Sequence, residues 1–334
     1  MPASVTQLLR ISGYAFLIAL VVTPILRDIF RAYNVVDRPG LRKVHAYPIP
    51  RLGGIALAAA YSMALAGQHV YALLWKLLPG AGLMFATGIL DDFFNLRARY
   101  KLAAQIAAGC LAWRMGLRAP GPDAISLPLT VFWLVLAANA FNLIDGLDGL
   151  CAGLGCIGAT VLFLLGWMQS DLALQRATLP LAAALLGFLC FNFSRATMFL
   201  GDSGALLIGF LLGCAGLIWS ADVGRHVRVV APVLAVAVPL MDVALAVVRR
   251  VITRRPIFAP DRAHTHHRLL DRGLNPTHVT LLLYAWGICG GVFAWLLAFP
   301  ALESWRWTVV AVFAAAMLLG ISQLKYSEFK WRHN

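Results

Sequence analysis

The stretch 139–150 reads NAFNLIDGLDGL and lies between two long apolar segments. It contains two carboxylates, two amides and two glycines where membrane-compatible residues would otherwise continue. Charged groups at the edge of a bilayer are costly, so they need water, a partner or a metal ion. The stretch therefore predicts membrane-crossing helices on both sides of a polar turn, and it marks that turn as a candidate functional site.

The composition of the 334-residue chain also predicts membrane insertion. Hydrophobic residues make up 60% and charged residues 13%, and the mean hydropathy is +0.77. Because a soluble domain carries about 25% charged residues, we expect an all-α polytopic membrane protein with a single domain over 1–334. The net charge of +13 indicates basic loops beside anionic lipid headgroups rather than a nucleic-acid partner.

The apolar segments are long enough to cross a bilayer many times. We expect about 10–11 transmembrane helices in one bundle, with approximate ranges 8–27, 53–68, 71–90, 101–117, 127–144, 149–168, 177–194, 203–220, 229–248, 279–299 and 306–324. The six cysteines lie in these segments without a CxxC pair. They are therefore expected to be small core residues rather than disulfides or zinc ligands.

The distribution of basic residues predicts the orientation of the chain. With eleven spans and a cytoplasmic C-terminus, twenty of the 28 Lys and Arg residues fall in cytoplasmic segments and seven in outer segments, while Lys76 lies within a span. Cytoplasmic loops are enriched in Lys and Arg. Every polar cluster then faces the cytoplasm, which predicts chemistry at the cytoplasmic face of a bacterial inner membrane.

Three acidic clusters fall at span ends on that side. Asp91 and Asp92 close the third span and repel each other unless a proton or cation intervenes, although a solvated helix end explains them equally well. Asp145 and Asp148 share a face if their segment is helical. Asp202 opens the eighth span, where the helix dipole alone favours a carboxylate. Beside the other two clusters, it becomes a candidate Mg²⁺ ligand.

Two basic segments complete the set of candidates. The sequence DRAHTHHRL at 261–269 combines three histidines with two arginines. These donors suit a pyrophosphate, whereas the ligand set typical of zinc is lacking and simple exposure is the alternative. The first cytoplasmic loop contains RKVH at 42–45 and PRLGG at 50–54. Such basic residues either set topology alone or grip an anion.

Taken in order, these motifs resemble those of the polyprenyl-phosphate N-acetylhexosamine-1-phosphate transferases, a family that includes WecA-like and MraY-like enzymes. The resemblance covers about 37–270 and rests on RKxH and PRxGG, the aspartate pair with Lys101 and Gln105, NxxNxxDGxDGL, FxGDxG and HxHH. The HxHH form resembles the WecA-like branch, because the MraY-like branch typically carries consecutive histidines. Ala205 replaces the serine usual in the family, which leaves fine substrate preference open.

The resemblance implies transfer of N-acetylhexosamine-1-phosphate, by default GlcNAc-1-phosphate, from a UDP-sugar to undecaprenyl or another polyprenyl phosphate, with release of UMP. It implies Mg²⁺ as cofactor, with Mn²⁺ as an alternative, and a first step in building a cell-surface glycan such as O-antigen or teichoic acid. The implied partners are UDP-N-acetylhexosamine, polyprenyl phosphate and membrane lipids, and a homodimer stays open. The alternatives are a phospho-N-acetylmuramoyl-pentapeptide transferase, a transporter using membrane-edge carboxylates, and a non-catalytic scaffold.

The resemblance also implies roles for individual residues. Asp202 would bind Mg²⁺, Asp91 and Asp92 would handle the lipid phosphate, and Asp145 would line the catalytic centre. Phe199 is expected to stack on uracil. The other residues expected to contact the substrates, at the uracil edge, the phosphates or the sugar, are Asn142, Gly146, Leu147, Asp148, Asn192, Lys43, Arg262, His264, His266 and His267.

Overall fold

The computed structural model describes residues 3–38, 47–68, 71–221, 229–254 and 264–323. Within these ranges the chain is helical, and the strand-like pairing is confined to an isolated antiparallel bridge between Asp37 and Ile49. The all-α prediction is therefore confirmed. The helices are α1 (Ala3–Ala32), α2 (Gly53–Gly67), α3 (Tyr71–Phe94), α4 (Ala98–Arg114), α5 (Asp123–Ile144), α6 (Leu150–Met168), α7 (Leu172–Asn192), α8 (Gly201–Ser220), α9 (Val230–Ala235), α10 (Ala237–Ile252), α11 (Thr265–Leu270), α12 (Pro276–Ala298), η2 (Pro300–Trp305) and α13 (Arg306–Gln323).

The helices have the lengths and compositions of a polytopic membrane protein. Among the described residues, α1, α3, α5, α6, α7, α8 and α12 are long and apolar enough to cross a membrane, and α2 and α13 contain shorter apolar helices. A helix lies in each of the eleven ranges expected from the sequence. The range 229–248 is divided at Val236 into α9 and α10, and Pro239 lies in the first turn of α10, where its missing N–H costs little.

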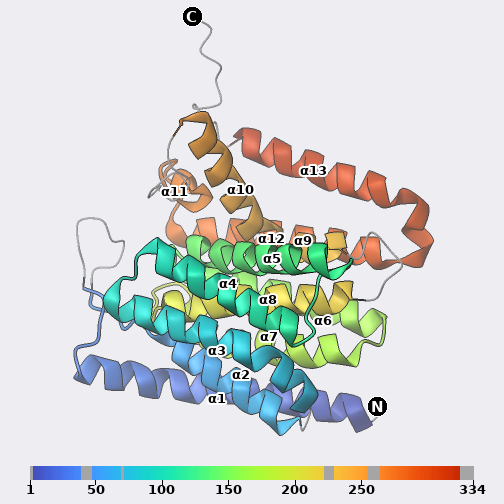
Figure 1. The fold of residues 1–334 in the computed structure, drawn as a ribbon. Helices are drawn as coiled ribbons and strands as arrows, with labels where there is room; N and C mark the ends of the chain where they lie inside the picture. The colour runs from blue at the N-terminus through green and yellow to red at the C-terminus, as the bar shows by residue number, and fades with distance from the viewer. Residues whose placement is uncertain (1–2, 39–46, 69–70, 222–228, 255–263, 324–334) are drawn as a thin grey trace, which may run out of the picture.

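Helix α8 occupies the centre of the bundle (Figure 1). It packs against α2, α3, α5, α6 and α7. In the most apolar part of α8, 94% of the residues are buried, whereas the corresponding share is 33% to 61% in the other long apolar helices. The sequence allows this because α8 is rich in glycine and alanine, and small residues let helix backbones approach closely in lipid. Helix α8 is therefore enclosed by other helices from Ser203 onward, while Gly201 and Asp202 at its start are partly exposed at one end of the bundle.

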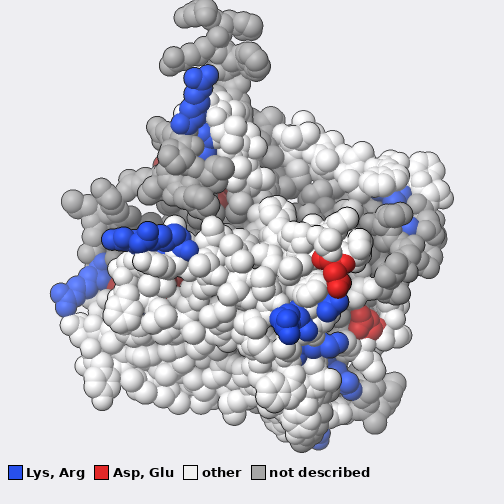
Figure 2. All heavy atoms as spheres, viewed as in Figure 1, with Lys and Arg blue, Asp and Glu red and all other residues white. Residues whose placement is uncertain are grey.

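Successive long helices run in opposite directions, so the end of one helix and the start of the next lie at the same end of the bundle. In Figure 1 the N-terminus of the chain lies at the right-hand end of the bundle and α11 lies toward the left-hand end. The ends of α3, α5 and α7 and the starts of α4, α6 and α8 meet at the α11 end. Figure 2 shows charged side chains toward the two ends of the visible face and an uncharged band between them, as expected of a surface that crosses lipid.

The cysteines only partly match the expectation of core positions. All six are free, as expected. Cys151 and Cys214 are buried, but Cys190 and Cys289 are exposed on α7 and α12. The expectation of a core role was wrong for these two, because an apolar residue on a membrane helix can face lipid as readily as protein.

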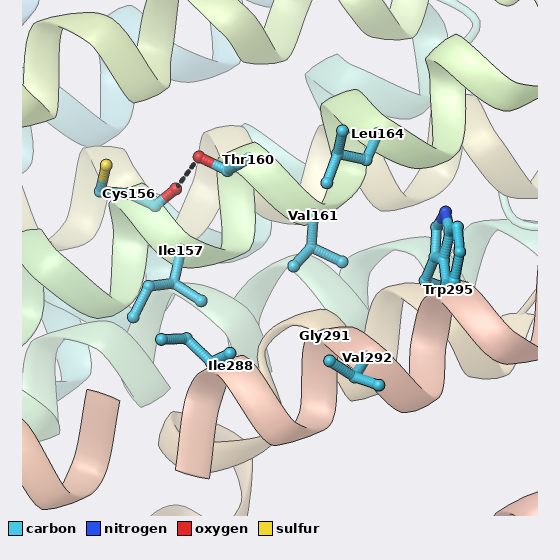
Figure 3. A pocket seen from close by; sticks show the side chains of 9 residues that line it. All are labelled: Cys156, Ile157, Thr160, Val161, Leu164, Ile288, Gly291, Val292 and Trp295. Carbon is cyan, nitrogen blue, oxygen red and sulfur yellow. Dashed lines mark hydrogen bonds between the residues drawn. The ribbon is translucent and has the colours of Figure 1, made fainter. Parts of the chain in front are cut away.

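An apolar cavity of about 360 Å³ opens between α6 and α12 (Figure 3). Its lining includes Val161, Leu164, Ile288 and Trp295. The hydroxyl of Thr160 donates to the carbonyl oxygen of Cys156 at 2.8 Å, so this polar group is satisfied within α6. The cavity is lined mainly by apolar groups, and it lies within the membrane-spanning helices rather than among the polar motifs.

Candidate active site

The end of α3 and the start of α8 are joined through Asp92. One carboxylate oxygen, Oδ1, accepts the backbone N–H of Asp202 at 2.9 Å, and Oδ2 accepts that of Ser203 at 3.1 Å. The first N–H groups of a helix have no partner within the helix, so Asp92 supplies the acceptors from another helix. Gly201 permits the contact, because its φ is +75° and a Cβ there would lie 2.8 Å from Oδ2.

Lys101, near the start of α4, binds the two other carboxylates of this junction. Its Nζ lies 2.7 Å from Asp91 Oδ2 and 3.1 Å from Asp202 Oδ2. The second oxygen of Asp91 accepts the backbone N–H of Leu96 at 2.7 Å. One ammonium group therefore holds two carboxylates that lie 111 positions apart in the chain.

The PRLGG segment of the first cytoplasmic loop lies against the same junction. Phe199 donates its backbone N–H to the carbonyl oxygen of Pro50 at 2.8 Å, and its own carbonyl oxygen accepts the N–H of Gly53 at 2.9 Å. The guanidinium of Arg51 donates to the carbonyl oxygen of Asp92. The glycines and arginine of this motif thus fix the FLGDSG segment in place.

The α5–α6 loop carries two aspartates in different surroundings. Asp148 Oδ2 accepts the backbone N–H groups of Arg195 at 3.2 Å and Ala196 at 2.9 Å, which ties this loop to the segment after α7. In that segment, Asn192 donates from Nδ2 to the carbonyl oxygen of Met198 at 2.9 Å. Both residues therefore shape the loops around the site.

Asp145 has no such support, since it accepts no hydrogen bond from any residue that the structure describes. Burial raises the pKa of its carboxyl well above the ordinary value, and the charges of Asp202, Asp92 and Asp148 raise it further. These charges also show that Asp145 belongs to the same electrostatic cluster as the α3–α8 junction. A cation or a donor group from a ligand would stabilise its ionised form.

The histidine segment reaches the same place from the far end of the chain. His266 is 1% exposed, and its imidazole lies so close to Gly146 that a Cβ there would be 2.3 Å from Nε2. Neither ring nitrogen has a hydrogen-bond partner among the described residues. Burial lowers the pKa of His266 to about 4, and the nearby His267 lowers it too, so the ring is neutral at neutral pH.

The histidine segment is helical from Thr265, where α11 begins, and His264 is the N-cap residue of that helix. His264 donates from Nδ1 to Asp242 Oδ2 at 2.6 Å, and the backbone N–H of Thr265 donates to Asp242 Oδ1 at 2.7 Å. A carboxylate that accepts the first N–H of a turn favours helix formation. This acceptor comes from α10, so local sequence alone could not indicate it.

The remaining candidates take varied positions. Asn142 is partly exposed in the last turn of α5, and Leu147 is buried in the α5–α6 loop. Gln105 and Asn139 exchange hydrogen bonds at 2.7 Å and 3.2 Å between α4 and α5. Lys43 and Arg262, which were expected to grip phosphates, lie outside the described residues.

Asp242 and Arg51 also belong to the site, although neither was among the residues predicted from the sequence. Asp242 is the lone carboxylate of an otherwise apolar stretch, and an ionisable residue within a membrane segment is itself a signal of function. Arg51 belonged to a recognised motif, but its target is a backbone carbonyl oxygen that no sequence pattern reveals. Both residues act by holding other residues in place.

The described residues contain no group of three His, Cys, Asp or Glu side chains arranged to hold a metal ion by themselves. Mg²⁺ does not need such a group, because it is usually bound by one or two carboxylates together with phosphate oxygens and water. Asp202 is partly exposed, and Asp145 lacks a donor among the described residues. This oxygen-rich pair therefore fits Mg²⁺ in the presence of a phosphate substrate.

The fold and the site together define a class: a polytopic membrane protein with a cluster of carboxylates and histidines at one end of its helix bundle. Comparison with known proteins shows to which family within this class the chain is similar. The family model for glycosyl transferase family 4 matches residues 74–220. A probable undecaprenyl-phosphate N-acetylglucosaminyl 1-phosphate transferase of Bacillus subtilis is 32% identical over 293 residues, which cover 84% of this chain and 82% of the relative.

Two further relatives agree. A decaprenyl-phosphate N-acetylglucosaminephosphotransferase of Mycolicibacterium smegmatis is 35% identical, over 81% of this chain and 77% of its own length. An undecaprenyl-phosphate alpha-N-acetylglucosaminyl 1-phosphate transferase of Escherichia coli is 29% identical, over 77% and 75% respectively. The chain therefore belongs to glycosyl transferase family 4, and the resemblance drawn from the motifs is confirmed. None of these relatives is a transporter or a pentapeptide transferase, so those alternatives are not favoured.

Proposed function

We propose that this protein transfers GlcNAc-1-phosphate from UDP-GlcNAc to undecaprenyl or another polyprenyl phosphate and releases UMP. The observation that carries the proposal is the convergence of four separate segments at one end of the bundle. They are the end of α3, the α5–α6 loop, the start of α8 and α11. The printed activities of the relatives support the choice of sugar and lipid carrier.

In this reaction an oxygen of the lipid phosphate bonds to the β-phosphorus of the UDP-sugar. The bond from that phosphorus to the oxygen shared with the α-phosphate breaks, and UMP leaves with that oxygen. A phosphate monoester has its second pKa near 6, so much of the lipid phosphate carries no proton at neutral pH. The carboxylates of the site are therefore needed for charge arrangement more than for proton removal.

The contacts of each site residue indicate its role in this reaction. Lys101 places a positive charge between Asp91 and Asp202. His266, neutral and unpaired among the described residues, can donate to or accept from a phosphate or sugar group beside Gly146. Asp202 and Asp145 would hold Mg²⁺, which neutralises negative charge on a pyrophosphate when bound. Mn²⁺ has similar ligand preferences and is the alternative ion.

We also propose that the site faces the cytoplasm across a bacterial inner membrane. UDP-sugars are made in the cytosol, whereas the lipid carrier is confined to the bilayer, so the two must meet at the inner face. The excess of Lys and Arg in the segments at the site end supports this orientation. Measuring the accessibility of a single added cysteine in the 47–52 segment, from each side of sealed vesicles, tests it.

The direct test is to incubate purified protein with Mg²⁺, undecaprenyl phosphate and a panel of UDP-sugars while measuring UMP. The expected result is release with UDP-GlcNAc that stops when the metal is chelated, and that the Asp202→Asn variant lacks. Release with UDP-GalNAc alone would correct the sugar. No release with any UDP-sugar from folded protein would overturn the proposed function.

A further inference from the structure

Asp242 is a carboxylate buried where carboxylates are costly. It lies in α10 within the stretch AVPLMDVALAVV at 237–248, and it is 2% exposed. Removing a carboxylate from water costs several kcal/mol unless it is paired and hydrogen-bonded. None of the transferase motifs includes this residue. Its partners must therefore explain why the fold accommodates it.

Both oxygens of Asp242 bind the segment that begins α11. Oδ2 lies 2.6 Å from His264 Nδ1, and Oδ1 accepts the N–H of Thr265 at 2.7 Å. Helix α11 has no side-chain cap of its own, since the side chain of its N-cap residue accepts no backbone N–H. Asp242 therefore supplies from another helix the acceptor that starts this turn.

The same contact sets the chemical form of His264. An ionised carboxylate only accepts hydrogen bonds, so the contact places a hydrogen on Nδ1 of His264. The rings of His264 and His266 are parallel within 7°, with centroids 5.9 Å apart. His266 in turn lies against Gly146 of the α5–α6 loop. A chain of contacts thus connects the Asp242 carboxylate to the catalytic loop.

We propose that Asp242 is a positioning residue for the histidine segment. Through His264 it fixes the tautomer of one imidazole, and through the turn at Thr265 it holds His266 beside Gly146. The ligand that the two imidazoles would meet is the pyrophosphate of the nucleotide-sugar donor. The proposal rests on the proposed function for this ligand, but the tautomer of His264 does not depend on it.

The test compares Asp242→Asn with wild type. The amide keeps an oxygen for the N–H of Thr265 but turns an NH₂ donor toward His264, which favours the opposite tautomer with hydrogen on Nε2. We expect folded protein whose rate of UMP release falls about 10- to 100-fold, as is typical when a partner that orients an imidazole is lost. In ¹⁵N NMR of histidine-labelled protein, the His264 signal, assigned by its loss in His264→Gln, should change from Nδ1-protonated to Nε2-protonated.

The matched control is Asp171→Asn. Asp171 also accepts a backbone N–H at a helix start, from Leu174 at 3.0 Å, but it lies at the opposite end of the bundle without an imidazole partner. This control should keep activity within about twofold of wild type. The double variant Asp242→Asn with His264→Gln should be no slower than His264→Gln alone, because residues acting through one contact are not additive.

The outcomes separate the two proposals. Asp242→Asn with wild-type activity, or additive loss in the double variant, would overturn the positioning role. If wild type releases no UMP with any UDP-sugar, the proposed function fails, while the NMR experiment still decides whether Asp242 sets the tautomer. If Asp242→Asn does not fold, wild-type NMR decides alone: a hydrogen on Nδ1 of His264 supports the role, and an Nδ1 without a hydrogen overturns it.

Discussion

The α3–α8 junction and the α5–α6 loop both present aspartates at the same end of the bundle, yet they differ in how those carboxylates are supported. In the junction, Asp92 binds two backbone N–H groups, and Asp91 and Asp202 share Lys101. In the loop, Asp148 binds backbone N–H groups, whereas Asp145 accepts nothing from the described residues. Burial raises the pKa of Asp92 as well as that of Asp145, but at Asp92 the backbone N–H groups of Asp202 and Ser203 oppose the shift, whereas at Asp145 the charges of neighbouring carboxylates add to it. The comparison predicts opposite effects of the same substitution in the two regions.

The largest effect is expected for Asp145→Asn. Removing the charge weakens a candidate Mg²⁺ ligand, so the rate of UMP release should fall about 100-fold or more. Thermal stability should stay the same or rise, because burial and neighbouring carboxylates already disfavour this charge. Rate assays and thermal unfolding in the same lipid nanodiscs check both parts. Activity within threefold of wild type would remove Asp145 from the catalytic centre.

Gly146→Ala tests the contact between the α5–α6 loop and His266 in the histidine segment. The added Cβ would lie 2.3 Å from His266 Nε2 and must displace the ring. A shift of this size should slow UMP release about 10- to 100-fold. Gly82→Ala is the control, because a Cβ at this position in α3 meets nothing within 4 Å. Equal activity of the two variants would show that the ring position is unimportant.

Asp92→Asn should act mainly on stability, in contrast to Asp145→Asn. The amide can accept one of the two backbone N–H groups at the start of α8 but opposes the other with its own NH₂. Loss of a helix-capping acceptor costs about 0.5–2 kcal/mol, so the midpoint of thermal unfolding should fall. If Asp92→Asn leaves the unfolding midpoint unchanged while Asp145→Asn lowers it, the distinction between the regions is wrong.

The smallest effect concerns the protonation of His266. Its pKa in the folded protein is lowered from 6.5 to about 4, so the unfolded chain binds a proton at a higher pH than the folded one. The stability contributed by the neutral ring is therefore complete above pH 6.5 and is lost as the pH falls through 4. An NMR titration of the ring should give a midpoint near 4. A midpoint at 6.5 or above would mean that the ring is solvated.

The sequence by itself determined the class of fold and the identity of most polar groups that meet at the site. Long apolar segments must bury their backbone hydrogen bonds in helices when they cross lipid, so eleven helical ranges and their polar ends could be read directly. The five motifs then indicated the family. Asp202 at the start of a span was predicted in its correct place because Gly201 and the apolar run that follows mark a helix boundary.

Only the tertiary structure decided which of these polar groups support one another. Nothing in the spacing of Asp91, Asp92 and Asp202 shows that Asp92 caps α8 while Lys101 holds the other two. Likewise, the histidine motif does not reveal that Asp242, 22 residues earlier, fixes His264. Such contacts join residues distant in the chain, and they depend on how far α8 and α10 approach their neighbours. Local sequence sets what each group can donate or accept, but the packing of the helices sets which partner it meets.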